Sequence, residues 1–95
     1  IVAITRGGEG SLMVTREDNY EHPGVSAQVE DTIGAGDCFT AALTYYALRR
    51  CSLPMLAEAA NRWGAWVATQ RGGMPFLDEH TRHTVDAAIQ EANRI

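Results

Sequence analysis

Lysine is absent from this chain, and all 8 basic residues are arginines, set against 12 acidic residues. The net charge is −4, and no basic stripe is present that would neutralise nucleic-acid phosphates, so no nucleic-acid partner is expected. A Walker-type phosphate loop is also excluded, because its lysine must reach the β and γ phosphates. Any phosphate bound here must therefore be held by backbone amides or by arginine.

Cysteine is scarce as well. Cys38 and Cys51 are too few and too far apart for a disulfide framework or the usual metal-ligand pair. We therefore expect the reducing cytoplasm as the compartment. At a helix start, Cys38 would have a lowered pKa and a reactive thiol, or it would act as a small packing residue. No apolar run approaches the length needed to span a bilayer, so no membrane partner is expected.

The chain has 95 residues, which allows at most one small domain with a modest core. It opens directly on the apolar run Ile1–Ile4, the beginning of a strand. We expect the chain to be the C-terminal portion of a longer protein.

Short strands are predicted at both sides of a glycine-rich turn. Residues 1–5 and 11–15 have strand composition, and Gly7–Gly10 joins them. A second turn is predicted at Asp18–Asn19. Residues 25–30 alternate apolar and polar side chains, which predicts a half-buried strand leading to the next glycine-rich turn.

Three helices are predicted in the rest of the chain. The first begins near Cys38, the second runs from about Pro54 to Thr69, and the third begins near Asp78, which would cap it. Their apolar residues recur at three- and four-residue spacing: Phe39, Ala42, Leu43, Tyr46 and Ala47; Leu56, Ala59, Ala60, Trp63, Trp66 and Val67; Val85, Ala88, Ile89 and Ala92. Strands covered by helices predict a three-layer α/β arrangement whose sheet is incomplete.

The segment 31–37, DTIGAGD, has the residue types of a phosphate-binding helix start. Gly34 and Gly36 permit backbone conformations in which successive N–H groups converge in front of the positive end of a helix. Asp37 falls in the first helical turn, where its carboxylate is placed to take a proton from a hydroxyl that attacks the same phosphate. In the alternative interpretation, Asp37 only stabilises the helix dipole and the glycines only shape the loop.

The longer string 31–39, DTIGAGDCF, resembles the second signature of the ribokinase-like (PfkB-type) carbohydrate kinases. The resemblance also covers the segment 4–11, the Ala60–Asn61 pair and the segment 71–75, in the order found in that family. It implies that the chain, residues 1–95, is the C-terminal nucleotide-binding and catalytic segment of a ribokinase-like α/β/α fold. The sugar-binding part and the lid, through which a homodimer would form, would lie outside these residues.

The resemblance implies a role for each matching residue. Asp37 would be the general base, and the amides of Gly34, Ala35 and Gly36, with that of Asp37, would form the anion hole. The implied nucleotide contacts are Thr5, Gly7, Gly10, Asn61 and Gly64. A plain hairpin turn at Gly7–Gly10, and a solvated or locally hydrogen-bonded Asn61, are the alternatives.

The resemblance also implies metal ions. A monovalent cation, K⁺, would be bound by Asp31, Ile33 and Gly72, although Phe76 stands where some relatives have a small polar residue, and Asp31 could instead cap its turn. Mg²⁺ would accompany ATP, and most of its ligands would lie upstream of Ile1. His22, His80 and His83 do not make a zinc set and are expected to be exposed. Trp63 and Trp66 would either stack on adenine or pack in the core.

The function implied is the transfer of the γ-phosphate of ATP to a hydroxyl group of a sugar. A nucleoside kinase of the same family is the close alternative, because the acceptor pocket that separates the two lies outside this chain. The second hypothesis comes from another class: alone, the chain would be a noncatalytic nucleotide-binding or assembly module that needs a partner to complete its sheet. We expect the 95 residues alone to be inactive.

Overall fold

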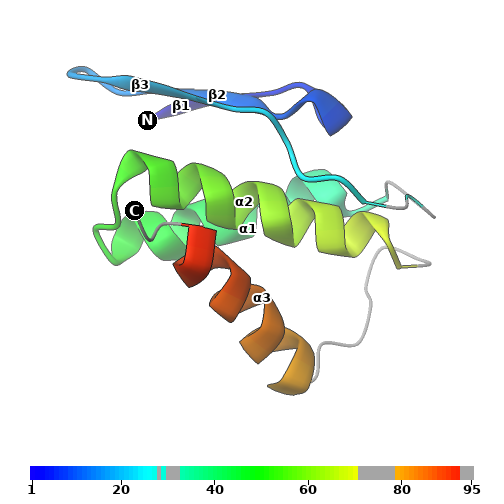
Figure 1. The fold of residues 1–95 in the computed structure, drawn as a ribbon. Helices are drawn as coiled ribbons and strands as arrows, with labels where there is room; N and C mark the ends of the chain where they lie inside the picture. The colour runs from blue at the N-terminus through cyan, green and yellow to red at the C-terminus, as the bar shows by residue number, and fades with distance from the viewer. Residues whose placement is uncertain (28, 30–32, 71–78, 93–95) are drawn as a thin grey trace.

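The computed structural model describes residues 1–27, 29, 33–70 and 79–92. Three strands come first: β1 (Val2–Thr5), β2 (Ser11–Val14) and β3 (Asn19–His22), with a short 3-10 helix, Gly7–Glu9, between β1 and β2. The helices α1 (Ala35–Leu48), α2 (Leu53–Ala68) and α3 (Glu79–Ala92) follow (Figure 1). The predicted helices and the first two strands are confirmed, while the proposed Asp78 cap lies outside the described residues.

The three strands form one antiparallel sheet in the order β1-β2-β3. Val2 lies opposite Val14, and Ser11 lies opposite His22. Because side chains alternate across a strand, Ser11 and Met13 are buried against the helices, while the next residues point the other way. The face away from the helices is therefore apolar and uncovered in the described structure, with Val2 60% and Ile4 49% exposed.

The prediction of a strand at 25–30 is wrong for the residues that the structure describes there. Residues 25–27 and 29 are not in a strand, and the third strand is instead β3, which begins at Asn19, where only a turn was predicted. The Thr15–Asp18 turn explains the difference, because the Thr15 N–H donates to Asp18 O at 2.7 Å and directs Asn19 back along β2. Alternation of side chains reports half-burial but does not identify a hydrogen-bonding neighbour.

Local sequence sets where α1 and α2 begin. Gly34 precedes α1 with φ +83°, a left-handed conformation that favours glycine. Ser52 caps α2, where its hydroxyl accepts a hydrogen bond from the Met55 N–H at 3.4 Å, and Pro54 occupies the opening turn. Both helix starts are thus encoded by short-range features.

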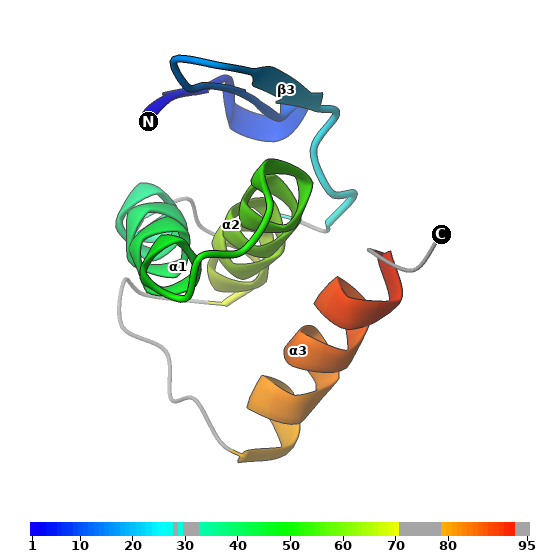
Figure 2. The ribbon, with the colours of Figure 1, turned by 90° about the vertical axis from the view of Figure 1, so that its left-hand side faces the viewer.

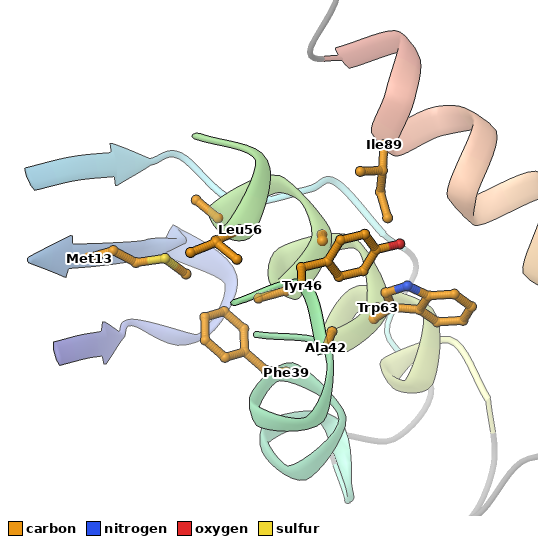
Figure 3. Packing of buried hydrophobic residues seen from close by; sticks show 10 residues of the cluster. Met13, Phe39, Ala42, Tyr46, Leu56, Trp63 and Ile89 are labelled. Carbon is orange, nitrogen blue, oxygen red and sulfur yellow. The ribbon is translucent and has the colours of Figure 1, made fainter. Parts of the chain in front are cut away.

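The elements stack in layers, and all three helices lie on one side of the sheet (Figure 2). α1 and α2 lie side by side beneath the strands, and α3 packs on α2 at the side away from the sheet. Met13 from the sheet points toward Leu56 and Phe39, while Ile89 brings α3 to the same cluster (Figure 3). The core consists of Met13, Phe39, Ala42, Tyr46, Leu56, Ala57, Ala59, Ala60, Trp63 and Ile89. Among the described helices, none is long and apolar enough to cross a membrane.

Candidate functional site

A cavity of about 450 Å³ lies between the first glycine-rich turn and the helices α1 and α2. Seven of the residues predicted to form the nucleotide and phosphate site line this one cavity. They come from β1 and its turn, from the start of α1 and from the middle of α2: Thr5, Gly7, Gly10, Ala35, Gly36, Asn61 and Gly64. The tertiary structure therefore brings together residues that are up to 59 positions apart in the chain.

The glycine-rich turn forms one wall of the cavity. The Arg6 N–H donates to Gly10 O at 2.8 Å and closes the turn around the 3-10 helix. Gly10 has φ +95°, and a Cβ atom built there would lie 1.9 Å from His22 O and 2.6 Å from Gly24 N. Gly10 is thus required by close backbone packing, so the turn is both a hairpin connection and part of the cavity wall.

The N-terminus of α1 forms the second wall. The first α1 hydrogen bond runs from the Cys38 N–H to Gly34 O at 3.0 Å, so the amides of Ala35, Gly36 and Asp37 precede the helical ladder. A Cβ atom at Gly36 would meet nothing within 4 Å, so the space at this Cα is open, and Gly36 lines the cavity. This arrangement is suited to an anion, since amide dipoles and the helix dipole act together there.

Gly34 and Asp37 are beside the cavity without lining it. Gly34 caps α1, and Asp37 lies in its first turn with an exposed side chain. The role of Asp37 as a base stays a prediction; the structure shows that this residue lies at the N-terminal end of α1.

Asn61 is buried in α2 rather than solvated, with 8% of its surface exposed. Its side-chain nitrogen donates to Ser11 Oγ at 2.9 Å and to Ala57 O at 2.7 Å. The local hydrogen bonding weighed for Asn61 is confirmed, and the bond to Ser11 also joins α2 to the sheet. The residue still borders the cavity, so its role toward a nucleotide stays a prediction.

Gly64 brings α1 and α2 close together at the cavity. A Cβ atom there would lie 3.3 Å from Ala35 O and 3.6 Å from Phe39 Cβ. The missing side chain thus lets α2 approach the first turn of α1. This contact explains the glycine independently of any ligand.

The predicted cation ligands are only partly visible. Ile33 is exposed in the turn before α1, while Asp31 and Gly72 lie outside the described residues. Over the described ranges, no three or more His, Cys, Asp or Glu side chains are grouped so as to hold a metal ion.

The burial of individual side chains tests three predictions, for Cys38, for the histidines and for the two tryptophans. Burial raises the pKa of the Cys38 thiol, so the lowered pKa considered for it is wrong and Cys38 packs against the core. His22 is 6% exposed, not solvent-exposed, whereas His80 and His83 are exposed as expected. Trp63 lies in the core with its ring edge toward Trp66, 5.6 Å between centroids, and neither lines the cavity.

Sequence reasoning missed the segment after β3 as part of the site. Gly24, Val25, Ser26 and Ala27 line the cavity, and Gly24 has φ +94°. The Pro23–Gly24 pair is an ordinary turn signal that could have drawn attention to this segment. Its position beside Gly8 and Gly10 depends on tertiary packing and has no local signature.

Comparison with known proteins gives one consistent result. The model of the pfkB family carbohydrate kinases matches residues 1–80. The aminoimidazole riboside kinase of Salmonella typhimurium is 38% identical over 85 residues, which cover 80% of this chain and 26% of that protein. The ATP-dependent ribose-1-phosphate kinase of Halopiger xanaduensis is 36% identical over 72 residues, covering 76% and 24%.

A solved structure gives a comparable picture. The nucleoside kinase of Burkholderia thailandensis, in complex with inosine, matches with a TM-score of 0.85 at 28% identity, covering 96% of this chain and 30% of that one. The chain spans about a quarter of the length of the curated relatives it matches.

Proposed function

The chain belongs to the pfkB family of carbohydrate kinases, and we propose that it carries the ATP site and the catalytic base of a kinase that phosphorylates a sugar hydroxyl. Its fold is ribokinase-like. The observation that carries the proposal is the single cavity lined by Thr5, Gly7, Gly10, Ala35, Gly36, Asn61 and Gly64.

In this proposal the nucleotide lies between the glycine-rich turn and α2, with its phosphates directed to the start of α1. Thr5, Gly7 and Gly10 present backbone and a small side chain, so the ribose and phosphates approach closely. Asn61 and Gly64 border the position of the base. Ala35 and Gly36 line the cavity, so the proposal directs the transferring phosphoryl group to the amides at the start of α1.

In this proposal Asp37 is the general base that accepts the proton of the acceptor hydroxyl. The acceptor hydroxyl oxygen forms a bond to the γ-phosphorus while the bond from that phosphorus to the β,γ-bridging oxygen breaks, and ADP leaves. The hydroxyl proton passes to the Asp37 carboxylate. The amides of Gly34, Ala35, Gly36 and Asp37 stabilise the negative charge that develops on the phosphoryl oxygens.

Several parts of the proposal lie outside the described residues. Mg²⁺ bound with ATP would neutralise charge on the phosphates, and its ligands would lie mostly outside this chain. K⁺ would be held by Asp31, Ile33 and Gly72, because carboxylate and carbonyl oxygens are hard donors that suit such a cation. The sugar-binding part and the dimer-forming lid belong to other segments of the protein, which we place in the cytoplasm.

A nucleoside is the alternative acceptor. The specific observation that favours it is the match to the Burkholderia thailandensis nucleoside kinase in complex with inosine. Sugars and nucleosides share the reacting hydroxyl group, so the residues described here serve either acceptor. An acceptor panel separates the two.

The uncovered face of the sheet favours an assembly role for the 95 residues when they are isolated. Val2, Ile4 and Val14 are exposed on this face, on the side opposite the helices. An apolar surface of this kind is buried by further polypeptide in most proteins. We therefore propose that residues 1–95 bind nucleotide alone but turn over only together with the rest of a kinase.

The experiment is the Asp37→Asn substitution in the native gene product that carries these residues, assayed by ADP release with a panel of sugars and nucleosides. We expect acceptor-dependent ADP release, and in the variant a kcat lower by roughly 100- to 10,000-fold with little change in the KM for ATP, because only the proton acceptor is lost. Asp18→Asn is the matched control, since Asp18 is exposed in the β2–β3 turn and its Oδ1 bond to the Asn19 N–H is kept by asparagine.

Two results contradict the proposal in different ways. A native protein that releases no ADP with any acceptor refutes kinase activity and favours the noncatalytic module. Near-normal kcat in Asp37→Asn refutes the assignment of Asp37 as base while leaving the kinase activity in place.

A further inference from the structure

His22, at the end of β3, connects the sheet to α2 although its side chain does not line the cavity. The ring is buried, and its two nitrogens have different partners. The Gly24 N–H donates to Nδ1 at 2.9 Å, and Nε2 lies 2.5 Å from Glu58 Oε2. The imidazole therefore links the segment after β3 to a carboxylate on α2, 36 residues away.

The partners determine which nitrogen carries the proton. A backbone N–H only donates, so Nδ1 must accept and has no hydrogen. Nε2 carries the hydrogen and donates it to the Glu58 carboxylate, which also accepts from Arg62 Nε at 2.9 Å. His22 is thus held as the neutral Nε2–H tautomer, with a donor and an acceptor that are both used.

The hydrogen bond to Gly24 acts on the cavity wall. Gly24 lines the cavity and is in backbone contact with the glycine-rich turn: a Cβ atom on Gly24 would lie 2.7 Å from Gly8 O and 3.0 Å from Gly10 N. A shift of the Gly24 peptide therefore moves or releases the turn that the proposed function assigns to the nucleotide. The Nδ1 bond sets the orientation of this peptide.

We propose that His22 is a positioning residue for ATP binding, which acts through its Nδ1 bond to the Gly24 amide and so fixes the wall shared by Gly24 and Gly10. The proposal rests on the proposed function, because it needs the cavity to hold the nucleotide. Glu58 and Arg62 serve this role indirectly, since they fix the tautomer and the ring orientation.

Two substitutions separate the two nitrogens. His22→Asn keeps an acceptor, because the Asn Oδ1 occupies the place of Nδ1 and accepts from the N–H two residues on, as in an Asx turn, while the bond to Glu58 is lost. His22→Gln keeps a donor near the place of Nε2 and loses the acceptor for Gly24. The pair are therefore matched controls for each other.

The measurements are ATP affinity by calorimetry and hydrogen exchange of the Gly24 amide, both on the native gene product. We expect His22→Asn to bind ATP within about twofold of the wild type, and His22→Gln to bind roughly fivefold more weakly, the effect of one lost hydrogen bond. The Gly24 amide should exchange faster in His22→Gln than in His22→Asn. The ¹⁵N shifts of the wild-type ring should show a protonated Nε2 and an unprotonated Nδ1, which requires no variant to fold.

Several results overturn the proposal. Equal ATP affinity and equal Gly24 exchange in His22→Gln and the wild type would show that the bond positions nothing. An equal loss of ATP affinity in both variants would assign the effect to Glu58, and a protonated Nδ1 in the wild type would exclude the bond itself. If the wild type binds no ATP, the proposed function fails, and the Gly24 exchange rates still decide whether His22 anchors the wall.

Discussion

Alanine substitutions at the three glycines of the turn between β1 and β2 should have very different costs. Gly10 has φ +95° and ψ −145°, a conformation that is almost restricted to glycine and costs other residues about 1–3 kcal/mol. The added Cβ would also lie 1.9 Å from His22 O and 2.6 Å from Gly24 N, so backbone must move, at a further cost of about 1–3 kcal/mol. We expect Gly10→Ala to lower the free energy of unfolding by about 4 kcal/mol.

The neighbouring glycines provide graded controls in the same turn. Gly7 has φ +57° but open space around its Cβ position, so Gly7→Ala should cost about 1–2 kcal/mol from the left-handed conformation alone. Gly8 has open space and no positive φ, so Gly8→Ala should leave stability unchanged or raise it by up to about 1 kcal/mol through the unfolded chain. The three variants together separate steric clash from backbone conformation.

Urea unfolding of the native gene product, followed by far-ultraviolet circular dichroism, measures this series. Native proteins have about 5–15 kcal/mol of stability, so the loss in Gly10→Ala is a large fraction of the total. The urea midpoint should be highest for Gly8→Ala, lower for Gly7→Ala and lowest for Gly10→Ala, and the dependence of the unfolding free energy on urea concentration should be the same in all three. A Gly10→Ala midpoint equal to that of Gly8→Ala would refute the close packing of the two cavity segments.

Two further predictions concern buried polar contacts. Burial and the bond from Tyr46 to Asp86 Oδ1, 2.7 Å long, raise the pKa of Tyr46 from its ordinary value near 10 to about 12. The folded state therefore holds this proton more tightly, and the stabilisation present below pH 10 should be lost as the pH rises from 10 toward 12. The Tyr46→Phe variant should lack this loss. Equal declines in the urea midpoints of the wild type and Tyr46→Phe at alkaline pH would contradict the prediction. Asn61→Asp replaces the donor to Ser11 and Ala57 by an acceptor and should cost about 3 kcal/mol in urea unfolding at pH 7, whereas wild-type stability would exclude these bonds.

The sequence alone was sufficient to predict those structural features that depend only on neighbouring residues in the chain. The apolar spacing in α1 and α2 predicted which faces are buried, because a helix repeats every 3.6 residues regardless of its neighbours. The start of the first helix was predicted near Cys38, whereas α1 begins at Ala35; Asp37 lies in its first turn, as expected. The resemblance added an expectation that spacing could not give, namely that Thr5 and Asn61 contact the same nucleotide; in the structure both residues line the same cavity.

Structural features that depend on contacts between two segments distant in the sequence became known only from the tertiary structure. Three such features are the pairing of β2 with β3, the close approach of Gly10 to Gly24 and the bond from His22 to Glu58. In each of them, nothing in the local sequence of one residue indicates which residue is its partner. Backbone polar groups and buried side chains take whichever partner the packed chain brings within reach, and that choice depends on the whole chain. Composition and periodicity describe what one segment can do, whereas the cavity exists only where the glycine-rich turn, the segment after β3, α1 and α2 meet.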